Sequence, residues 1–150
     1  MSEKMIEMSL PETGPDVARA RAGLLRVCEP PSAAVASFVN RVGAVQAWRA
    51  VLSRRAPRAV LAATAARTQD LEPDDALRRA DADLVVADAA GARLIGPGDR
   101  DWPAPAFAAF DGALARGVRG ASAPLALYAR GRLPAGLPGD GVTIVGSRAS

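Results

Sequence analysis

Apolar residues recur at helical spacing along the first part of the chain, as far as Gly91. Asp16 opens the first run, in which Val17, Ala20 and Leu24 fall on one face of a helix, and a Pro-Pro pair ends it. The same period predicts further helices, which begin near Ser32, Ala44, Pro57 and Asp70. The pattern therefore predicts a compact bundle of about four or five short helices.

Capping residues mark the limits of the second predicted helix. Ser32 stands where a side-chain oxygen can accept a hydrogen bond from the first turn, and Gly43 stands where a left-handed residue ends a helix. A third helix is then expected from Ala44 to Leu52, and a fourth helix is expected to follow Pro57.

Arginines accompany these helices. Arg54, Arg55 and Arg58 surround Pro57 at the end of the third helix, where cations complement the negative end of the helix dipole. Charge runs are usually solvated faces, so a structural role is favoured over a DNA contact for this trio. The arginines of the first helix are expected on its remaining surface, at Arg19, Arg21 and Arg26.

An acidic segment precedes the fifth predicted helix. Asp70, Glu72, Asp74 and Asp75 surround Pro73, and the helix continues through Ala76, Leu77 and Ala80 towards Leu84. Clustered carboxylates are found in acid/base and metal sites, but acids are also what the helix dipole favours in a first turn. The structural interpretation is therefore preferred.

Short extended segments and turns replace the helical period after Gly91. They are an extended segment at Ala92–Ile95, a turn at Gly96–Asp99, a brief helix around Ala106–Phe110, and a strand with a turn within Pro124–Gly131. Trp102 stands beside Pro103 between the turn and the brief helix. A single aromatic beside proline is expected to pack over the edge of a core rather than to stack on a base.

The last ten residues predict a buried strand that runs into a small turn. The strand, Val142–Val145, consists of four β-branched residues, which favour a pleated ladder, and its unbroken apolar run suggests a parallel strand buried on both faces. In a doubly wound sheet the carboxyl end of such a strand opens into the ligand crevice. Gly146, Ser147 and Arg148 lie there, and they offer close backbone approach, a hydroxyl donor and a planar fork of donors. This chemistry fits an anion such as phosphate.

Composition limits the kinds of chemistry that the chain can perform. The 150 residues are 49% hydrophobic and only 4% aromatic, so the core is expected to consist mainly of Ala, Leu and Val. The sequence has no histidine, so any catalysis would depend on carboxylates. Cys28 is the only cysteine, which excludes an intrachain disulfide and favours a small buried side chain. The net charge of +3 permits an anionic partner without requiring one.

The N-terminal segment gives no sign of secretion or membrane insertion. It mixes acids with apolar residues and leads into the breaker cluster Leu10–Pro15, so residues 1–13 are expected to form a flexible tail. No apolar stretch is long enough to span a bilayer. We therefore expect a soluble cytoplasmic protein without a membrane partner.

Four segments carry a family resemblance. In chain order they are Arg93–Asp99, Asp101–Pro103, Pro124–Gly131 and Val142–Arg148. Their order and character resemble the DNA-processing protein A family, also called Smf. The resemblance implies a helical SAM-like domain followed by a Rossmann-like domain that binds single-stranded DNA. It also implies protection of incoming DNA and loading of the RecA recombinase during natural transformation.

The expected fold class is α+β, with a SAM-like helical domain over 14–90 and the opening strands of a Rossmann-like α/β domain over 91–150. Because that domain is incomplete, the chain is expected to be an N-terminal fragment that binds DNA poorly by itself. The resemblance implies that Gly146 admits the phosphate backbone, Ser147 donates to it, and Arg148 pairs with a phosphate. It implies no catalytic residue, metal or cofactor, and a homodimer in the full-length family.

Two other functions remain open from the sequence. Nucleotide-processing hydrolases related to lysine-decarboxylase-like proteins also place a Gly-Ser turn after a hydrophobic strand of a Rossmann-type sheet, and their catalytic residues would lie beyond Ser150. A helical interaction module is the other alternative. It predicts that residues 14–90 fold alone and retain any partner binding.

Overall fold

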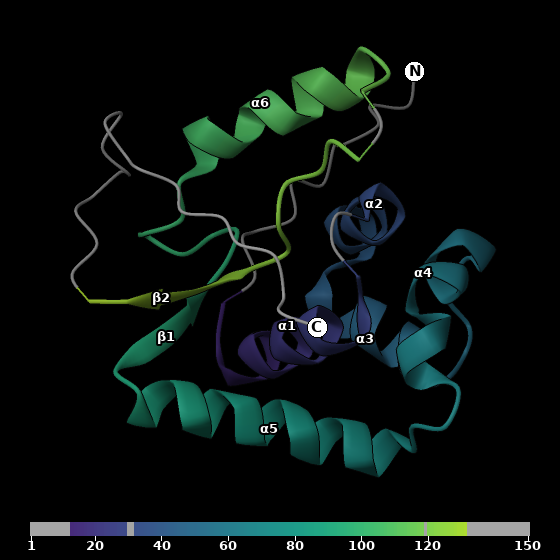
Figure 1. Ribbon diagram of the computed structural model, residues 1–150, viewed down its shortest axis with the longest axis vertical. Coiled ribbons are helices and arrows are strands. Elements are labelled where there is room, and N and C mark those ends of the chain that lie inside the picture. The colour runs from purple at the N-terminus through teal and green to yellow at the C-terminus, as the bar shows by residue number, and fades with distance from the viewer. Residues whose placement is uncertain (1–12, 30–31, 119, 132–150) are drawn as a thin grey trace, which may run out of the picture.

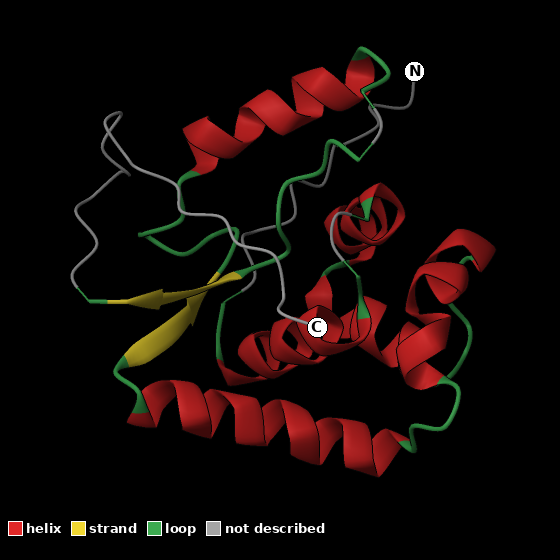
Figure 2. Cartoon of the chain, viewed as in Figure 1, coloured by secondary structure: helices red, strands yellow, loops and turns green. Residues whose placement is uncertain are grey.

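The computed structural model describes residues 13–29, 32–118 and 120–131. Five helices come first along the chain: α1 (Pro15–Val27), α2 (Ala33–Val42), α3 (Ala44–Leu52), α4 (Arg58–Thr68) and α5 (Pro73–Ala89). Strand β1 (Ala92–Ile95), helix α6 (Ala104–Ala115) and strand β2 (Leu127–Arg130) follow. Figure 2 shows that helices predominate and that the two strands form a short hairpin beside them. The described part of the chain is therefore α+β, as expected.

Helix α1 is the centre of the bundle and packs against α3, α4 and α5. Its residues Leu24 and Val27 are among the largest fully buried side chains, together with Val35 of α2 and Val60 of α4. Alanines fill much of the remaining core, at Ala20, Ala44, Ala47, Ala76 and Ala80. The expectation of a core built from Ala, Leu and Val is confirmed.

Close contact between α1 and α3 depends on a glycine. A Cβ atom at Gly23 would lie 2.5 Å from Cζ2 of the buried Trp48 side chain, well inside van der Waals contact. The indole therefore packs directly on the backbone of α1. A larger residue at this position would push the two helices apart.

The predicted helix boundaries agree closely with the structure. The Ser32 hydroxyl accepts a hydrogen bond from the Val35 amide at 3.3 Å, as an N-cap does. Gly43 separates α2 from α3. Its φ of 83° is a backbone conformation that other residues adopt only with strain. Helix α5 begins at Pro73 and extends to Ala89, beyond the expected end near Leu84.

Strands β1 and β2 pair antiparallel, with Leu94 opposite Tyr128. Strand β1 also packs on α1 and α5, which joins the hairpin to the bundle. The parallel strand expected at Val142–Val145 and most of the tail expected at 1–13 lie outside the described residues.

Helix α6 lies on the opposite side of the molecule from α5 (Figure 1). It is longer than the brief helix expected around Ala106–Phe110, and none of its residues is buried. Its aromatic and aliphatic side chains Phe110 and Leu114 are about two-fifths exposed, at 38% and 43%. No helix within the described ranges is long and apolar enough to cross a membrane.

Candidate functional site

The phosphate-binding residues expected from the sequence, Gly146, Ser147 and Arg148, lie outside the described residues. The structure describes the segment that leads towards them, including the turn after β1 and the strand β2. This turn forms one wall of a cleft against the helical bundle. It is the candidate site that the described residues build.

The turn after β1 is held by a buried arginine of α1. One terminal nitrogen of Arg21, Nη2, donates to the Pro97 carbonyl at 2.6 Å, and Nη1 lies 3.5 Å from Oδ2 of Asp99. The same Asp99 oxygen accepts from the Gly96 amide at 2.7 Å. Arg21 therefore satisfies a backbone carbonyl and a carboxylate in the turn, while Asp99 also closes the turn on itself.

The guanidinium of Arg21 leaves no space for a side chain at position 96, which is a glycine. A Cβ atom there would lie 2.5 Å from Nη1 of Arg21 and 2.7 Å from Cζ. Because Arg21 is hydrogen-bonded and its side chain is only 8% exposed, it has little room to move away. The absence of a side chain at Gly96 therefore allows the turn to rest directly on Arg21.

The expectation that Arg21 lies on the surface of the first helix is wrong. Arg21 falls one helical turn from Val17 and from Leu24, on the face that packs into the core. A buried guanidinium is tolerated there because the turn after β1 supplies its acceptors. The position of Arg21 within the apolar stripe of the first helix could have indicated that it is buried. The sequence does not show which residues accept its hydrogen bonds.

Arg19 and Arg26 do lie on the outer part of α1, and both reach α5. Arg26 makes two hydrogen bonds to Asp83, at 2.8 and 2.7 Å, and Arg19 bonds to Asp81 at 2.5 Å. The hydrogen bond to Asp83 raises the pKa of the Arg26 guanidinium further above its usual range. These pairs fix α5 alongside α1 and leave both arginines engaged.

The aromatic residues beside the turn form one packed group. The ring centroids of Trp102 and Phe107 are 4.8 Å apart, and those of Phe107 and Phe110 are 6.1 Å apart. Trp102 is half-buried. It packs against Phe107 of α6.

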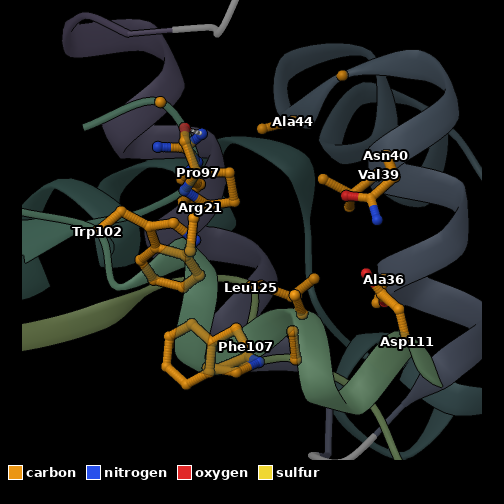
Figure 3. A pocket seen from close by; sticks show the side chains of 16 residues that line it. Arg21, Ala36, Val39, Asn40, Ala44, Pro97, Trp102, Phe107, Asp111 and Leu125 are labelled. Atoms are coloured by element: carbon orange, nitrogen blue, oxygen red, sulfur yellow. Dashed lines mark hydrogen bonds between the residues drawn. The ribbon is translucent and has the colours of Figure 1, made fainter. Parts of the chain in front are cut away.

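A cleft of about 360 Å³ lies between this aromatic group and α2. Figure 3 shows Arg21, Pro97 and Trp102 on one side of it and Val39 and Asn40 on the other. Its walls consist mainly of alanine, glycine, valine, leucine, proline and aromatic residues, and its polar side chains are those of Arg21, Asn40 and Asp111. The cleft can hold a small apolar or flat group and can donate or accept hydrogen bonds at its edge.

The described residues give no support to acid/base or metal chemistry. Asp74 and Asp75 lie in the first turn of α5 after Pro73, and Asp75 forms an ion pair with Arg78. The acidic segment therefore starts a helix, as the sequence predicts. Within the described ranges, histidine, cysteine and acidic residues form no group of three that could hold a metal ion. Cys28 is buried, and its burial raises the pKa of the thiol above its ordinary value.

The three arginines at the α3–α4 connection, Arg54, Arg55 and Arg58, differ in whether their side chains are bonded within the protein. Arg54 has a φ of 56°, and its Nη2 donates to the carbonyls of Thr68 and Gln69 at 3.1 and 3.0 Å. It therefore caps the C-terminus of α4 rather than that of α3. Arg55 and Arg58 are exposed, and no ion pair is found for either among the described residues. Arg54 thus has a structural role, at α4 rather than at the expected α3, and the exposed side chains of Arg55 and Arg58 fit the solvated end that the sequence predicts.

Comparison with known proteins identifies relatives along most of the chain. Two curated proteins, from two strains of Mycobacterium tuberculosis, are each 40% identical to it over 135 residues, and both carry a provisional assignment as DNA processing protein DprA. The match covers 89% of this chain and 33% of theirs, so the chain spans about a third of the length of these relatives. No protein-family model matches the chain, and no solved structure matches it. Over most of its own length, the chain is thus similar to part of two proteins named as DNA processing protein DprA.

Proposed function

We propose that this chain is part of a DNA-processing protein that binds single-stranded DNA, protects it and helps to load RecA onto it during natural transformation. The observation that carries the proposal is the 40% identity over 135 residues to relatives named as DNA processing protein DprA. The order of the four sequence segments supports the same assignment.

In this proposal the chain contributes two parts. Residues 14–90 form the SAM-like helical domain, and residues 91–150 begin a Rossmann-like domain. The contacts of Arg21 with Pro97 and Asp99 support a fixed placement of the second part on the first.

Gly146, Ser147 and Arg148 contact the phosphate backbone in this proposal. Gly146 lets the backbone approach, Ser147 donates a hydrogen bond and Arg148 pairs with a phosphate. Their residue types support this role. The protein acts by binding, without a catalytic residue or cofactor, as a cytoplasmic homodimer.

The test is Arg148→Ala in a form of the protein that has the full length of the relatives. Binding of a labelled single-stranded oligonucleotide is measured by fluorescence anisotropy at several salt concentrations, with Arg130→Ala as a control of equal charge. We expect Arg148→Ala to weaken binding and to lower the salt slope by about 0.7, the value for one phosphate contact on a single strand. Unchanged affinity and slope would contradict the role of Arg148.

A second measurement tests the proposed activity as a whole. RecA filament formation on single-stranded DNA coated with a single-strand-binding protein should be faster when the full-length protein is present. Release of a base from a nucleoside monophosphate by the same preparation would instead favour the hydrolase alternative.

A further inference from the structure

Charge is unevenly distributed between the helices. The stretch from Ser32 to Gln69, which holds α2, α3 and α4, has six arginines and no acid or lysine. Helix α5 follows with five acids and two arginines, and several of its acids pair with arginines. Positive charge on the middle helices is therefore not balanced by acids within the same stretch.

Three of the six arginines have a partner that explains them. Arg41 lies over the ring of Phe38, 5.5 Å from its centroid, Arg54 caps α4, and Arg67 pairs with Glu29 at 3.3 Å. The other three are Arg49, Arg55 and Arg58. All three are exposed, and no acidic partner is found for them within the described part of the chain.

These three arginines lie at and beside the connection between α3 and α4. The amides of Arg55 and Ala56 both donate to the Ala50 carbonyl, at 2.8 and 3.1 Å, so the chain folds back on the last turn of α3. Arg49 lies beside that carbonyl in the sequence, and Arg58 is the first residue of α4. We call this cluster, formed by Arg49, Arg55 and Arg58, the α3–α4 corner.

We propose that the α3–α4 corner binds the phosphodiester backbone of nucleic acid, as a contact surface separate from Gly146–Arg148. Three exposed guanidinium groups that lack acidic partners suit phosphate oxygens, which they can bind through paired hydrogen bonds. The inference rests on the proposed function for its choice of nucleic acid as the polyanion.

The corner is suited to the backbone rather than to the bases. The aromatic residues of α2 and α3, Phe38 and Trp48, are buried at 8% and 4% exposure, so neither offers a ring for base stacking. Contacts to phosphates alone carry no sequence information. Binding at the corner should therefore be weak, sensitive to salt and independent of sequence.

The experiment uses the full 150-residue chain and a triple variant, R49A/R55A/R58A. Arg54 is left in place because it caps α4. The matched control, R79A/R100A/R116A, removes the same charge from exposed arginines elsewhere. Binding of one labelled oligonucleotide, as a single strand and as a duplex, is followed by fluorescence anisotropy across a salt series, and circular dichroism verifies that each variant is folded.

We expect the corner variant to bind about ten-fold or more weakly at low salt. The salt slope should fall by about 2 for the single strand and about 3 for the duplex, as expected for three lost phosphate contacts. A larger loss of affinity for the single strand or for the duplex identifies which form of nucleic acid the corner contacts. The control variant should retain the wild-type slope.

Several results would overturn the inference. The first is an unchanged affinity for the oligonucleotide in the corner variant, and the second is an equal loss of affinity in the control variant. The third is that the 150-residue chain binds polyglutamate in place of DNA. Arg148→Ala in the same chain separates the two proposals. If only Arg148→Ala loses binding, the proposed role of the α3–α4 corner is rejected and the proposed function stands. If only the corner variant loses binding, the role of the corner is supported and that of Gly146–Arg148 is not.

Discussion

Arg21 of α1 and Asp99 of the turn after β1 lie 3.5 Å apart, although 78 residues separate them in the sequence. The arginine side chain is 8% exposed and the aspartate side chain 33%. This pair, together with the bond from Arg21 to the Pro97 carbonyl, attaches the β-hairpin segment to the helical bundle. The attachment has measurable consequences for stability.

Replacing Arg21 with methionine should destabilise the chain. Methionine keeps much of the apolar stem but leaves the Pro97 carbonyl and the Asp99 carboxylate without this donor. Because Asp99 is one-third exposed and retains the Gly96 amide, we expect a loss of about 2 kcal/mol rather than the larger cost of a fully buried pair. Urea unfolding followed by circular dichroism measures it.

Arg19→Met is the matched control for that measurement. Arg19 also pairs with an aspartate across elements, but its side chain is 42% exposed. Water can replace its lost interactions, so its effect should be clearly smaller. Equal losses in the two variants would show that burial of Arg21 is not what matters.

A methyl group at Gly96 should disturb the same contact. The Cβ of Gly96→Ala would lie 2.5 Å from Nη1 of Arg21, so either the turn or the guanidinium must shift. We expect a loss of about 1 to 3 kcal/mol in the free energy of unfolding.

Gly112→Ala provides the contrasting substitution. Gly112 lies inside α6, and a Cβ there would meet only the flexible end of Arg116, at 3.3 Å. Alanine is favoured over glycine within helices, so stability should rise by about 0.5 to 1 kcal/mol. A similar loss at both glycines would contradict the steric explanation for Gly96.

The Cys28 thiol should react slowly and should make stability depend on alkaline pH. Burial raises its pKa above the ordinary value of 9.0, so the folded state keeps the proton that the unfolded state releases. This stabilising contribution is complete below pH 9 and is lost as the pH rises through the folded pKa. Urea unfolding at a series of alkaline pH values measures the loss, and a disulfide reagent should label the native thiol much more slowly than the unfolded one.

Cys28→Ala identifies the source of that pH dependence. Burial also raises the pKa of Tyr128 from 10.0, so a further decline at higher pH should persist in the variant. The part of the decline that begins near pH 9 should disappear. If it persists unchanged, Cys28 is not the titrating group.

Two substitutions at Arg54 separate backbone strain from capping. Arg54 adopts a φ of 56°, which glycine accepts without cost, and its guanidinium donates to the Thr68 and Gln69 carbonyls. Arg54→Ala loses the cap and keeps the strain, whereas Arg54→Gly loses the cap and relieves the strain. Arg54→Gly should therefore be more stable than Arg54→Ala by about 1 kcal/mol in thermal or urea unfolding. Equal stabilities would mean that the backbone at this position is not strained.

Much of the fold followed from features that act over a few residues. The cap at Ser32, the positive φ at Gly43, the span of Ala44–Leu52 and the Gly96–Asp99 turn all match their predictions. Each of these features depends on a local hydrogen bond, a backbone preference or the helical period. Such properties are encoded in residues that are neighbours in the sequence. The contact site at Gly146–Arg148 rests on the same kind of local evidence and stays a prediction.

Only the tertiary structure decided which charged side chains are engaged and which have no acidic partner among the described residues. Arg21 is buried because a turn 76 to 78 residues further along supplies its acceptors, and Arg54 caps a helix other than the one it follows. The cleft beside Trp102 likewise forms only where α2 meets the segment after β1. Such partners depend on how distant elements pack, since the energy of a buried charge is set by the groups that surround it in the folded chain.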